Sequence, residues 1–586
     1  MSAASSMQAV SAIQATGDEA ERAMLVRDLF VRAKEARRPL VARWKRAYRT
    51  LNNRDWSPGA GADSFSPTTH LPEIWPVIAS LVAWMTDQRP ILEVTSSAVP
   101  FGPLDDLYQG AAQDMNAVLQ AGFNEYQLDG EINQHLWDVM TYGVGYLATR
   151  WEPWLADGLG DSIFRRIDPF TVYPDPWARS PKDLNFIIIA RAMTVDDLDR
   201  AFPGSASAIN DGWVEDVDEA PHRLDTTLPS GGPRANLGPL SPSTNSSYRR
   251  TSRQAAGIDS PVVTVLECWI RQHEHEKKGD TTKTTESWRV IMTCGNKVLM
   301  DADGRETSGH GLQPIDRTVL FDTGEWYGPS LVDLLAPLQH GINRELANLA
   351  WNIALMGNPI LLEGSHVQSK RISNRPGQRI QVRNPSDVAW LNPPQIHPQL
   401  AVQLIEFYKS EIESISGMSA IVRGFAPSGR NAQGTMDQVQ DAAFVRVRAT
   451  LRELERTLRS VGTKMMANIA EFYTEPRVVS ITGPDGQRTA RLLRSRHFYR
   501  QLDDDGNEVP LRFNLQADAG SQMPTSRQAR QAQAQTLFAL GVIDEYEVLK
   551  AEQWPNWSVV AKRVMDAKSM AGTLGQPPGA RQRTRA

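Results

Sequence analysis

The sequence predicts an α+β protein in which helices begin and end the chain and β-strands lie between them. Apolar residues recur every three or four positions before residue 142 and again after residue 331, which is helical spacing. Two intervening stretches, 145–194 and 262–301, are rich in β-branched and aromatic residues and are bounded by turn signals. The 586 residues suffice for about four domains or for one large subunit of several parts.

The composition is that of an ordered globular protein. Apolar residues make up 41% of the chain and charged residues 22%, which excludes wholesale disorder and collagen-like or coiled-coil composition. The 63 Lys and Arg residues against 68 Asp and Glu residues give a net charge of −5. The chain therefore lacks the basic excess of proteins that hold nucleic acid tightly, and any contact with DNA is expected to be local or weak.

The cysteines and the apolar runs indicate in which cellular compartment the protein is expected. Cys268 and Cys294 cannot form a disulfide framework, and both are expected to be buried, unreactive side chains of a protein in a reducing compartment. The N-terminal residues show no signal-peptide pattern. The longest apolar run, 74–85, is too short to span a bilayer, so we expect a soluble protein and no membrane partner.

The first element is an amphipathic helix over 18–51. The face opposite its apolar stripe is expected to be basic, with Arg22, Arg27, Arg32, Lys34, Arg37, Arg38, Arg43, Lys45, Arg46 and Arg49. A solvated face is the simpler interpretation, and a docking surface for an acidic neighbour is the alternative.

Helices and then strands follow the first helix. Helices are predicted near 72–86, 104–128 and 131–142, and strands within 145–153, 162–176 and 185–194. Thr194 and Asp197 form a capping-box pattern at the start of a short helix. The segment 204–257 is poor in apolar residues and is predicted to be a mobile insertion. Strand character returns within 262–272 and 287–301, and in the second stretch Gly295 and Asn296, a hairpin-turn pair, lie between two β runs.

The second half is mostly helical. A helix over 331–356 has one apolar stripe of Leu334, Leu338, Ile342, Leu346, Leu349 and Ile353. A second helix covers 398–416, and Thr435 with Gln438 caps a third that extends to about residue 473, or roughly 55 to 60 Å. The remaining predicted elements are hairpins within 477–515, three short helices near 526–540, 544–553 and 557–570, and a flexible tail.

Motifs for catalysis are not found. The sequence lacks the phosphate-binding GxxxxGK[ST] loop of motors and kinases. The string HEHEK at 273–277 does not have the spacing of a zinc helix, and the DADG and DDDG strings near Asp301 and Asp503 are interpreted as hairpin turns rather than calcium loops. No cofactor, metal site or catalytic residue is therefore assigned, which favours binding or assembly over catalysis.

The order of elements and several strings resemble the portal proteins of tailed bacteriophages, the head-to-tail connectors. The strings are WDVMTYGVGYLATRWEP with RIDPFTVYPDPWA, YGPSLVDLLAPLQHGINRELANLAWNIALMGNPIL, and the segment from GMSAIVRGFAPSGRNAQG through the long helix to VVSITG. The resemblance extends from about residue 20 to 570. It implies a non-enzymatic ring of usually twelve subunits in the virion, at one capsid vertex, assembled in the host cytoplasm.

The resemblance also implies a portal-type subunit with a mixed α/β wing, a helical stem, a small α/β clip, a long helix and a helical crown. The parts are expected to be a wing over 18–327 with the insertion 204–257, stem helices over 328–356 and 398–416, a clip over 357–397, a tunnel loop over 417–434, the long helix and wing hairpins over 435–519, a crown over 520–571 and a tail over 572–586.

Two groups of residues are expected to act in such a ring. In the tunnel loop, Arg423 and Arg430 lie among glycines and would meet passing double-stranded DNA, while Val422 and Phe425 would buttress the loop; an ordinary surface loop is the alternative. In the clip, a basic set of residues is expected to dock to terminase or to a head-tail adaptor, and a simply solvated surface is the alternative. The set is Lys370, Arg371, Arg375, Arg379 and Arg383. Capsid and scaffolding proteins are further implied partners.

Two other functions stay open on the sequence alone. A nucleic-acid packaging or processing enzyme is one, although the missing phosphate loop argues against it. Another head or tail structural protein is the second.

Overall fold

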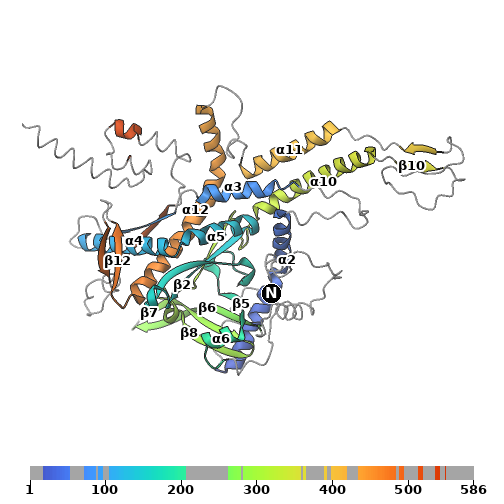
Figure 1. Cartoon of the computed structure of the whole chain (residues 1–586). Coiled ribbons are helices and arrows are strands. Elements are labelled where there is room, and N and C mark those ends of the chain that lie inside the picture. The colour runs from blue at the N-terminus through green and yellow to red at the C-terminus, as the bar shows by residue number, and fades with distance from the viewer. Residues whose placement is uncertain are drawn as a thin grey trace, which may run out of the picture. The chain divides into compact units, whose positions relative to one another are not determined.

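The computed structural model describes residue 13 and residues 17–52, 71–86, 90–96, 105–205, 262–278, 281–357, 360–363, 388–391, 398–418, 433–482, 488–493, 513–518, 535–540 and 548. The chain divides into two compact units. Unit 1 comprises Met1–Asp87, Gly130–Ala148 and Arg165–Arg430, and unit 2 comprises Gln88–Asp129, Thr149–Phe164 and Asn431–Ala586. Helices and strands occur in both, so the α+β prediction is confirmed at the level of fold class (Figure 1).

A five-stranded antiparallel sheet forms much of unit 1. Its strands lie in the order β4-β5-β6-β7-β8, which are Val172–Pro174, Phe186–Thr194, Val262–Lys278, Thr281–Cys294 and Lys297–Asp303. The turn at Gly295, which has a φ of 61°, joins β7 to β8 and confirms the predicted hairpin. Cys268 and Cys294 are both buried thiols, as expected, and burial raises the pKa of Cys294 to about 11.

Helix α2 (Glu19–Leu51) packs against this sheet, and its two halves join different cores. Val26, Leu29, Phe30 and Ala33 pack with alternate residues of β5 and β6, including Phe186, Ile188 and Cys268. Val41 and Trp44 belong to the other cluster, with Ile187, Ile189 and Trp269. Because alternate strand residues point to opposite faces, one long helix thus contributes to the cores on both sides of the sheet.

Further elements of unit 1 connect the sheet to the helices. Helix α5 (Leu128–Tyr142) ends at Gly143, whose φ of 80° favours glycine, and β2 (Val144–Glu152) follows at once. β2 pairs antiparallel with β9 (Ile315–Val319). Helix α6 (Val195–Ala201) has the predicted cap, since the Asp197 N–H donates to the Thr194 hydroxyl at 3.1 Å. The shorter elements of unit 1 are η2 (Pro169–Thr171), η3 (Pro181–Asp183) and α9 (Gly304–Thr307), whereas η1 (Ala156–Gly158) and most of β3 (Asp161–Ile167) belong to unit 2.

Three helices and a ribbon complete unit 1. They are α3 (Ile74–Thr86), α10 (Leu331–Gly357), α11 (Pro398–Ser416), and the antiparallel pair β10 (Ile360–Glu363) and β11 (Val388–Leu391). Helices α10 and α11 lie side by side and form a rod, and the β10-β11 ribbon lies beyond its far end (Figure 1). The predicted bounds of both rod helices are confirmed to within a residue.

Unit 2 is built around the longest helix, α12 (Gln433–Phe472), with α4 (Asp105–Glu125) and two small sheets. The sheets pair β1 (Ile91–Ser96) with β14 (Phe513–Asp518) and β12 (Arg477–Thr482) with β13 (Arg488–Leu493). A Cβ on Gly462 of α12 would lie 2.4 Å from Leu515 of β14, so this glycine permits the close contact between helix and sheet. Strand β1, whose partner is more than 400 residues away, was not predicted from the sequence.

The structure corrects three sequence predictions. Helix α12 begins at Gln433, so Thr435, which was expected to cap it, lies inside the helix. Arg37, expected on the basic outward face of the first helix, is only 3% exposed. Asp301, expected in a hairpin turn, lies in β8, and the turn residues that follow instead begin α9, where Asp303 accepts a hydrogen bond from the Arg305 N–H at 3.1 Å. The site residues expected in the tunnel loop and in the clip, residues 206–257 of the insertion and the DDDG string lie outside the described residues.

Candidate functional site

The α10-α11 rod is held together by close packing between its helices. A Cβ on Gly341 of α10 would lie 2.9 Å from the ring of Tyr408 on α11, so only glycine at this position leaves room for the tyrosine ring. Ile342 of α10 and Ile405 and Ile412 of α11 are buried. The rod is therefore a packed helical hairpin over this length.

Two buried amides of α10 fix the base of the rod to α3. The Gln339 side-chain oxygen accepts the backbone N–H groups of Glu73 and Ile74 at 3.1 and 3.3 Å, and its Nε2 donates to Leu71. The Asn343 side-chain oxygen accepts the Leu71 N–H at 3.2 Å. These bonds satisfy N–H groups at the start of α3 that have no partner within the helix. Both amides are at most 2% exposed, and sequence patterns gave no sign of this role.

An ion pair completes this junction from α11. Lys409 Nζ lies 2.7 Å from the Glu73 carboxylate, which precedes the first turn of α3. Three helices that are far apart in sequence thus meet through polar side chains of α10 and α11. The rod is anchored at its base to the rest of unit 1.

The first turn of α10 is fixed by a cap and by close backbone contacts. Asp333 N–H donates to the Ser330 hydroxyl at 2.9 Å, and Arg43 of α2 lies 3.1 Å from the Asp333 carboxylate. A Cβ on Gly143 would lie 2.4 Å from the carbonyl oxygen of Gly328. Gly143 therefore permits the backbone at the entry of α10 to lie against the turn before β2. A Cβ on Gly328 itself would lie 2.6 Å from the carbonyl oxygen of Phe321.

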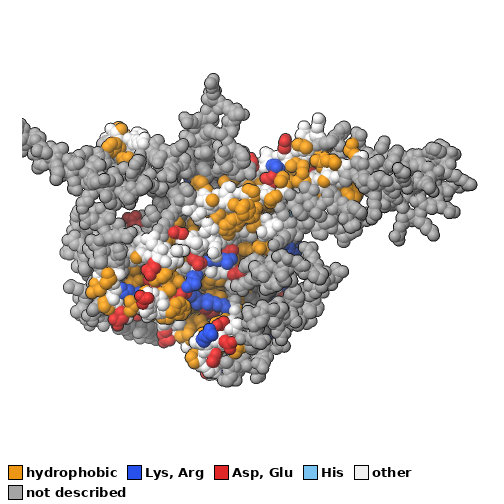
Figure 2. All heavy atoms as spheres, in the orientation of Figure 1, with side chains coloured by type: hydrophobic (Ala, Val, Ile, Leu, Met, Phe, Trp, Pro, Cys, Tyr) orange, Lys and Arg blue, Asp and Glu red, His pale blue; other side chains and the backbone are white. Residues whose placement is uncertain are grey.

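The outward surface of the rod is apolar. Figure 2 shows hydrophobic side chains gathered along the rod. The large exposed ones are Leu334 (42%), Ile353 (63%) and Met356 (55%) on α10, and Leu400 (64%), Val402 (44%), Phe407 (56%) and Ile415 (38%) on α11. In the predicted stripe of α10, Ile342 is buried, but Leu334 and Ile353 at its ends are open to solvent. Exposed apolar surface of this extent marks an interaction site.

The exposed and buried stripes of α11 are neighbours on the helix. The outer stripe consists of the exposed Leu400, Phe407 and Ile415 and the half-buried Leu404. One residue further along at each position lie the buried Ala401, Ile405 and Ser416 and the half-buried Tyr408. One residue corresponds to 100° of rotation about the helix axis. Helix α11 therefore presents two apolar stripes, one toward α10 of the same chain and one toward solvent.

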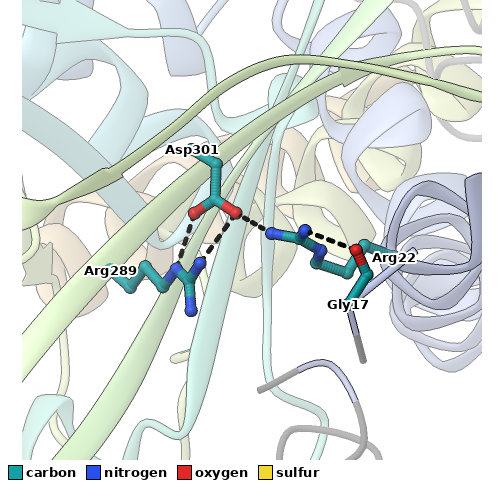
Figure 3. Close-up of polar contacts among 4 residues, drawn as sticks. All are labelled: Gly17, Arg22, Arg289 and Asp301. Carbon is teal, nitrogen blue, oxygen red and sulfur yellow. Dashed lines mark hydrogen bonds and ion pairs between the residues drawn. The ribbon is translucent and has the colours of Figure 1, made fainter. Parts of the chain in front are cut away.

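A second polar cluster joins α2 to the five-stranded sheet (Figure 3). The Asp301 carboxylate of β8 accepts two hydrogen bonds from Arg289 of β7, at 2.6 and 2.8 Å, and one from Arg22 of α2. Arg22 also donates to the Gly17 carbonyl oxygen at 3.2 Å. The cluster links the first turns of α2 to the sheet and has no catalytic geometry.

Arg37 of α2 is buried inside unit 1. Arg37 of α2 donates to the carbonyl oxygens of Pro169 at 2.9 Å, Phe170 at 2.8 Å and Val172, and its guanidinium lies 3.8 Å from the centre of the Tyr173 ring. A signal in the sequence could have placed it, because residue 37 falls between 33 and 41 in the buried stripe of α2. Arginine serves here because its planar group offers several donors at once.

The described residues contain no group of three or more His, Cys, Asp or Glu side chains that could hold a metal ion. Among the described helices, none has an apolar stretch long enough to cross a membrane. The best-defined candidate site is a surface for protein contact on the rod. In the sequence, α11 of this rod follows the segment expected to dock partner proteins and precedes the segment expected to contact DNA. Those segments contain Val422, Arg423, Phe425 and Arg430, and Lys370, Arg371, Arg375, Arg379 and Arg383, all outside the described residues.

A comparison with models of known protein families gave a match. The model of the phage P22-like portal protein family matches residues 27–584, nearly the whole chain. A comparison with curated proteins gave no match. The resemblance to tailed-phage portal proteins is confirmed by the family match, and the chain belongs to the P22-like phage portal protein family.

Proposed function

We propose that this chain is a non-enzymatic subunit of the portal ring at one capsid vertex, through which double-stranded DNA enters and leaves the virion. The observation that supports this most is the apolar outward surface of the α10-α11 rod. A single copy leaves Ile353, Leu400 and Phe407 more than half exposed, which is costly for a monomer in water.

Ring closure gives this surface a partner. A ring needs head-to-tail contacts in which two different faces of each subunit match. The exposed stripe of α11 and the exposed end of α10 lie on one rod and supply two such apolar faces. In this proposal the rod is the stem, its neighbours in the ring cover the apolar stripes, and twelve copies surround the channel.

Weak contact with DNA suits a channel through which DNA must slide. Each phosphate that is neutralised releases counterions and strengthens retention, so a passage needs few such contacts. The net charge of −5 supports a weak hold. In the proposed channel, Arg423 and Arg430 of the tunnel loop contact phosphates, and Val422 and Phe425 support the loop.

The segment between the rod helices is the proposed docking platform. Its basic residues Lys370, Arg371 and Arg375, with Arg379 and Arg383, outnumber the acidic residues of the stretch, Glu363 and Asp387. A cationic surface of this kind fits acidic patches on the terminase and on the head-tail adaptor. Capsid and scaffolding proteins are the further proposed partners.

Electron microscopy of the purified protein, with its mass in solution, tests the ring. The wild type is expected to form closed rings with an axial hole. The double variant Leu400→Glu, Phe407→Glu places charges in the proposed subunit contact and is expected to remain monomeric.

The matched control is Gln403→Glu, which adds a charge to an exposed polar position of the same helix. It is expected to assemble as the wild type does. A wild type that stays monomeric at every concentration, or a double variant that still forms rings, would contradict the proposal.

A further inference from the structure

The two helices of the rod differ in the charges that they carry. Helices α10 and α11 contain two Lys or Arg residues, Arg344 on α10 and Lys409 on α11. Lys409 is paired with Glu73 at the base of the rod, at 2.7 Å. Arg344 is thus the cation of these two helices that the junction with α3 does not use.

The guanidinium of Arg344 is open to solvent. Its side chain is 63% exposed, and its Nε donates to the Glu345 carboxylate at 3.2 Å. Adjacent residues of a helix do not face each other, so this contact holds the guanidinium only loosely. Its two terminal nitrogens have no partner among the residues that the structure describes. They can therefore bind a carboxylate from another chain, in the two-bond geometry that arginine favours.

Helix α11 offers an exposed carboxylate beside its outer apolar stripe. Glu406 is exposed and directly precedes Phe407, which is 56% exposed. Within the described part of the chain, the Glu406 carboxylate has no hydrogen-bond or ion-pair partner. A neighbour that covers the Phe407 ring would also take water from this carboxylate. A charge that loses water in this way needs an opposite charge on the neighbour.

Arg344 and Glu406 lie at nearly the same level along the rod. Gly341 of α10 faces the Tyr408 ring of α11, and the chain runs outward along α10 and returns along α11 (Figure 1). Three residues separate Arg344 from Gly341, and two separate Glu406 from Tyr408. Arg344 therefore lies roughly 4.5 Å and Glu406 roughly 3 Å beyond this contact, both toward the β10-β11 ribbon. Within one copy the two side chains form no ion pair.

We propose that Arg344 of one copy forms an ion pair with Glu406 of the next copy around the ring. The inference rests on the proposed function, because it requires rods of neighbouring copies to lie side by side. Rotation about the ring axis keeps equivalent residues at one height, so side chains at the same level of adjacent rods meet. Each copy contributes Arg344 to one neighbour and Glu406 to the other. The pair thereby fixes the level of each rod against the next.

The other unpaired carboxylate on the outer side of α11 fits less well. Glu411 is half-buried and lies between Phe407 and Ile415 in the outer stripe. It follows Tyr408 by three residues, so it lies on the base side of the contact with Gly341. Its level is therefore roughly 9 Å from that of Arg344, whereas the level of Glu406 differs by roughly 1.5 Å.

Charge reversal in the full-length chain tests the pair. Arg344→Glu and Glu406→Arg, each alone, place like charges at every contact of the ring. Each is expected to raise the protein concentration at which half of the chains are in rings at least about fivefold. The double variant restores opposite charges and is expected to assemble within about twofold of the wild-type concentration. Sedimentation velocity, with electron microscopy of the rings, measures assembly.

An equimolar mixture of the two single variants shows whether the pair joins different copies. In a ring where the variants alternate, each Arg344→Glu chain has a Glu406→Arg chain on both sides, so every contact regains opposite charges. The mixture is expected to form rings near the wild-type concentration. Mixing cannot restore an ion pair within one copy. The matched control is Arg200→Glu on α6, whose arginine side chain is 82% exposed, and it is expected to assemble alone as the wild type does.

The possible failures separate this pair from the ring itself. If both single reversals assemble at the wild-type concentration, the pair is wrong although the ring stands. A double variant or a mixture that stays unassembled would also overturn the pair, as would an Arg200→Glu control that is impaired equally. A wild type that forms no rings at any concentration would contradict the proposed function, and the pair would be wrong with it.

Discussion

Arg37 and Arg477 lie in different units and have the same kind of surroundings. Each guanidinium lies 3.8 Å from the centre of a tyrosine ring, that of Tyr173 for Arg37 and of Tyr473 for Arg477. Each also donates to consecutive backbone carbonyls, for Arg477 those of Leu159 at 2.6 Å and Gly160 at 2.5 Å. Carbonyl groups of irregular segments need partners when they are buried, and a single arginine satisfies several of them.

Replacing Arg37 therefore leaves several carbonyl oxygens without donors. Arg37→Met is expected to lower the free energy of unfolding by about 3 kcal/mol, because each unsatisfied buried group costs about 1 to 3 kcal/mol and the new side chain recovers part of the packing. Urea unfolding followed by tryptophan fluorescence measures the change. Arg38→Met removes an exposed arginine one residue away and is expected to change stability by less than about 0.5 kcal/mol. Equal losses in the two variants would contradict the assigned role of Arg37.

His135 adds a dependence on pH. It is fully buried in α5, with Nε2 2.7 Å from the Thr318 hydroxyl, and burial lowers its pKa to about 3. The unfolded chain, with an ordinary histidine pKa of about 6.5, binds more protons than the folded chain between these values. The stabilising contribution is thus fully present above about pH 6.5 and is lost as the pH falls toward 3, by about 1.4 kcal/mol for each pH unit.

The variant His135→Gln isolates this effect from that of other acids. One of these is Asp138, paired with Arg166 at 2.5 and 2.8 Å, whose pKa burial raises. The difference in unfolding free energy between wild type and variant is expected to shrink by about 2 to 3 kcal/mol from pH 6.5 to 4.5. Urea titrations at the two pH values measure it. A difference that does not vary with pH would show that His135 binds a proton in the folded protein.

At the scale of elements, the sequence predicted the helices well because their apolar spacing is local. The rod helices, the long helix and the β7-β8 hairpin lie where spacing and turn residues indicated. Strand β1 was missed because its partner, β14, is distant in sequence and its six residues carry little periodic signal. The roles of Gln339 and Asn343 were also missed, because they depend on a helix that is over 250 residues away.

The segment between α11 and α12 is proposed to contact DNA rather than to support the subunit. Helix α11 packs against α10, and α12 packs within unit 2, so each helix has contacts that do not require residues 420–430. Deletion of 420–430 is expected to leave ring formation intact and to lower DNA packaging or retention at least about tenfold. Electron microscopy and a nuclease-protection assay of filled heads measure the two results. Loss of rings would mean that the segment is structural.

At the scale of the whole molecule, a conduit and a DNA-binding protein differ in how affinity depends on salt. Affinity falls with salt concentration with a logarithmic slope of about −0.9 for each phosphate contact. The near balance of 63 basic and 68 acidic residues offers few uncompensated cations, so the assembled protein should make only a few such contacts.

Fluorescence anisotropy of a short labelled duplex is therefore expected to show weak binding to the wild-type ring, with a slope no steeper than about −3. Ser428→Arg adds a cation to the tunnel loop of every subunit and is expected to steepen the slope by at least about 0.9 and to slow release of DNA. The matched control Ser428→Gln adds bulk without charge and should leave the slope unchanged. If the wild type already shows a slope near −8, the channel holds DNA tightly, and the proposal that DNA passes through weak, unspecific contacts is wrong. If Ser428→Arg leaves the slope unchanged, the loop does not reach the phosphates, and residues on other elements must line the passage.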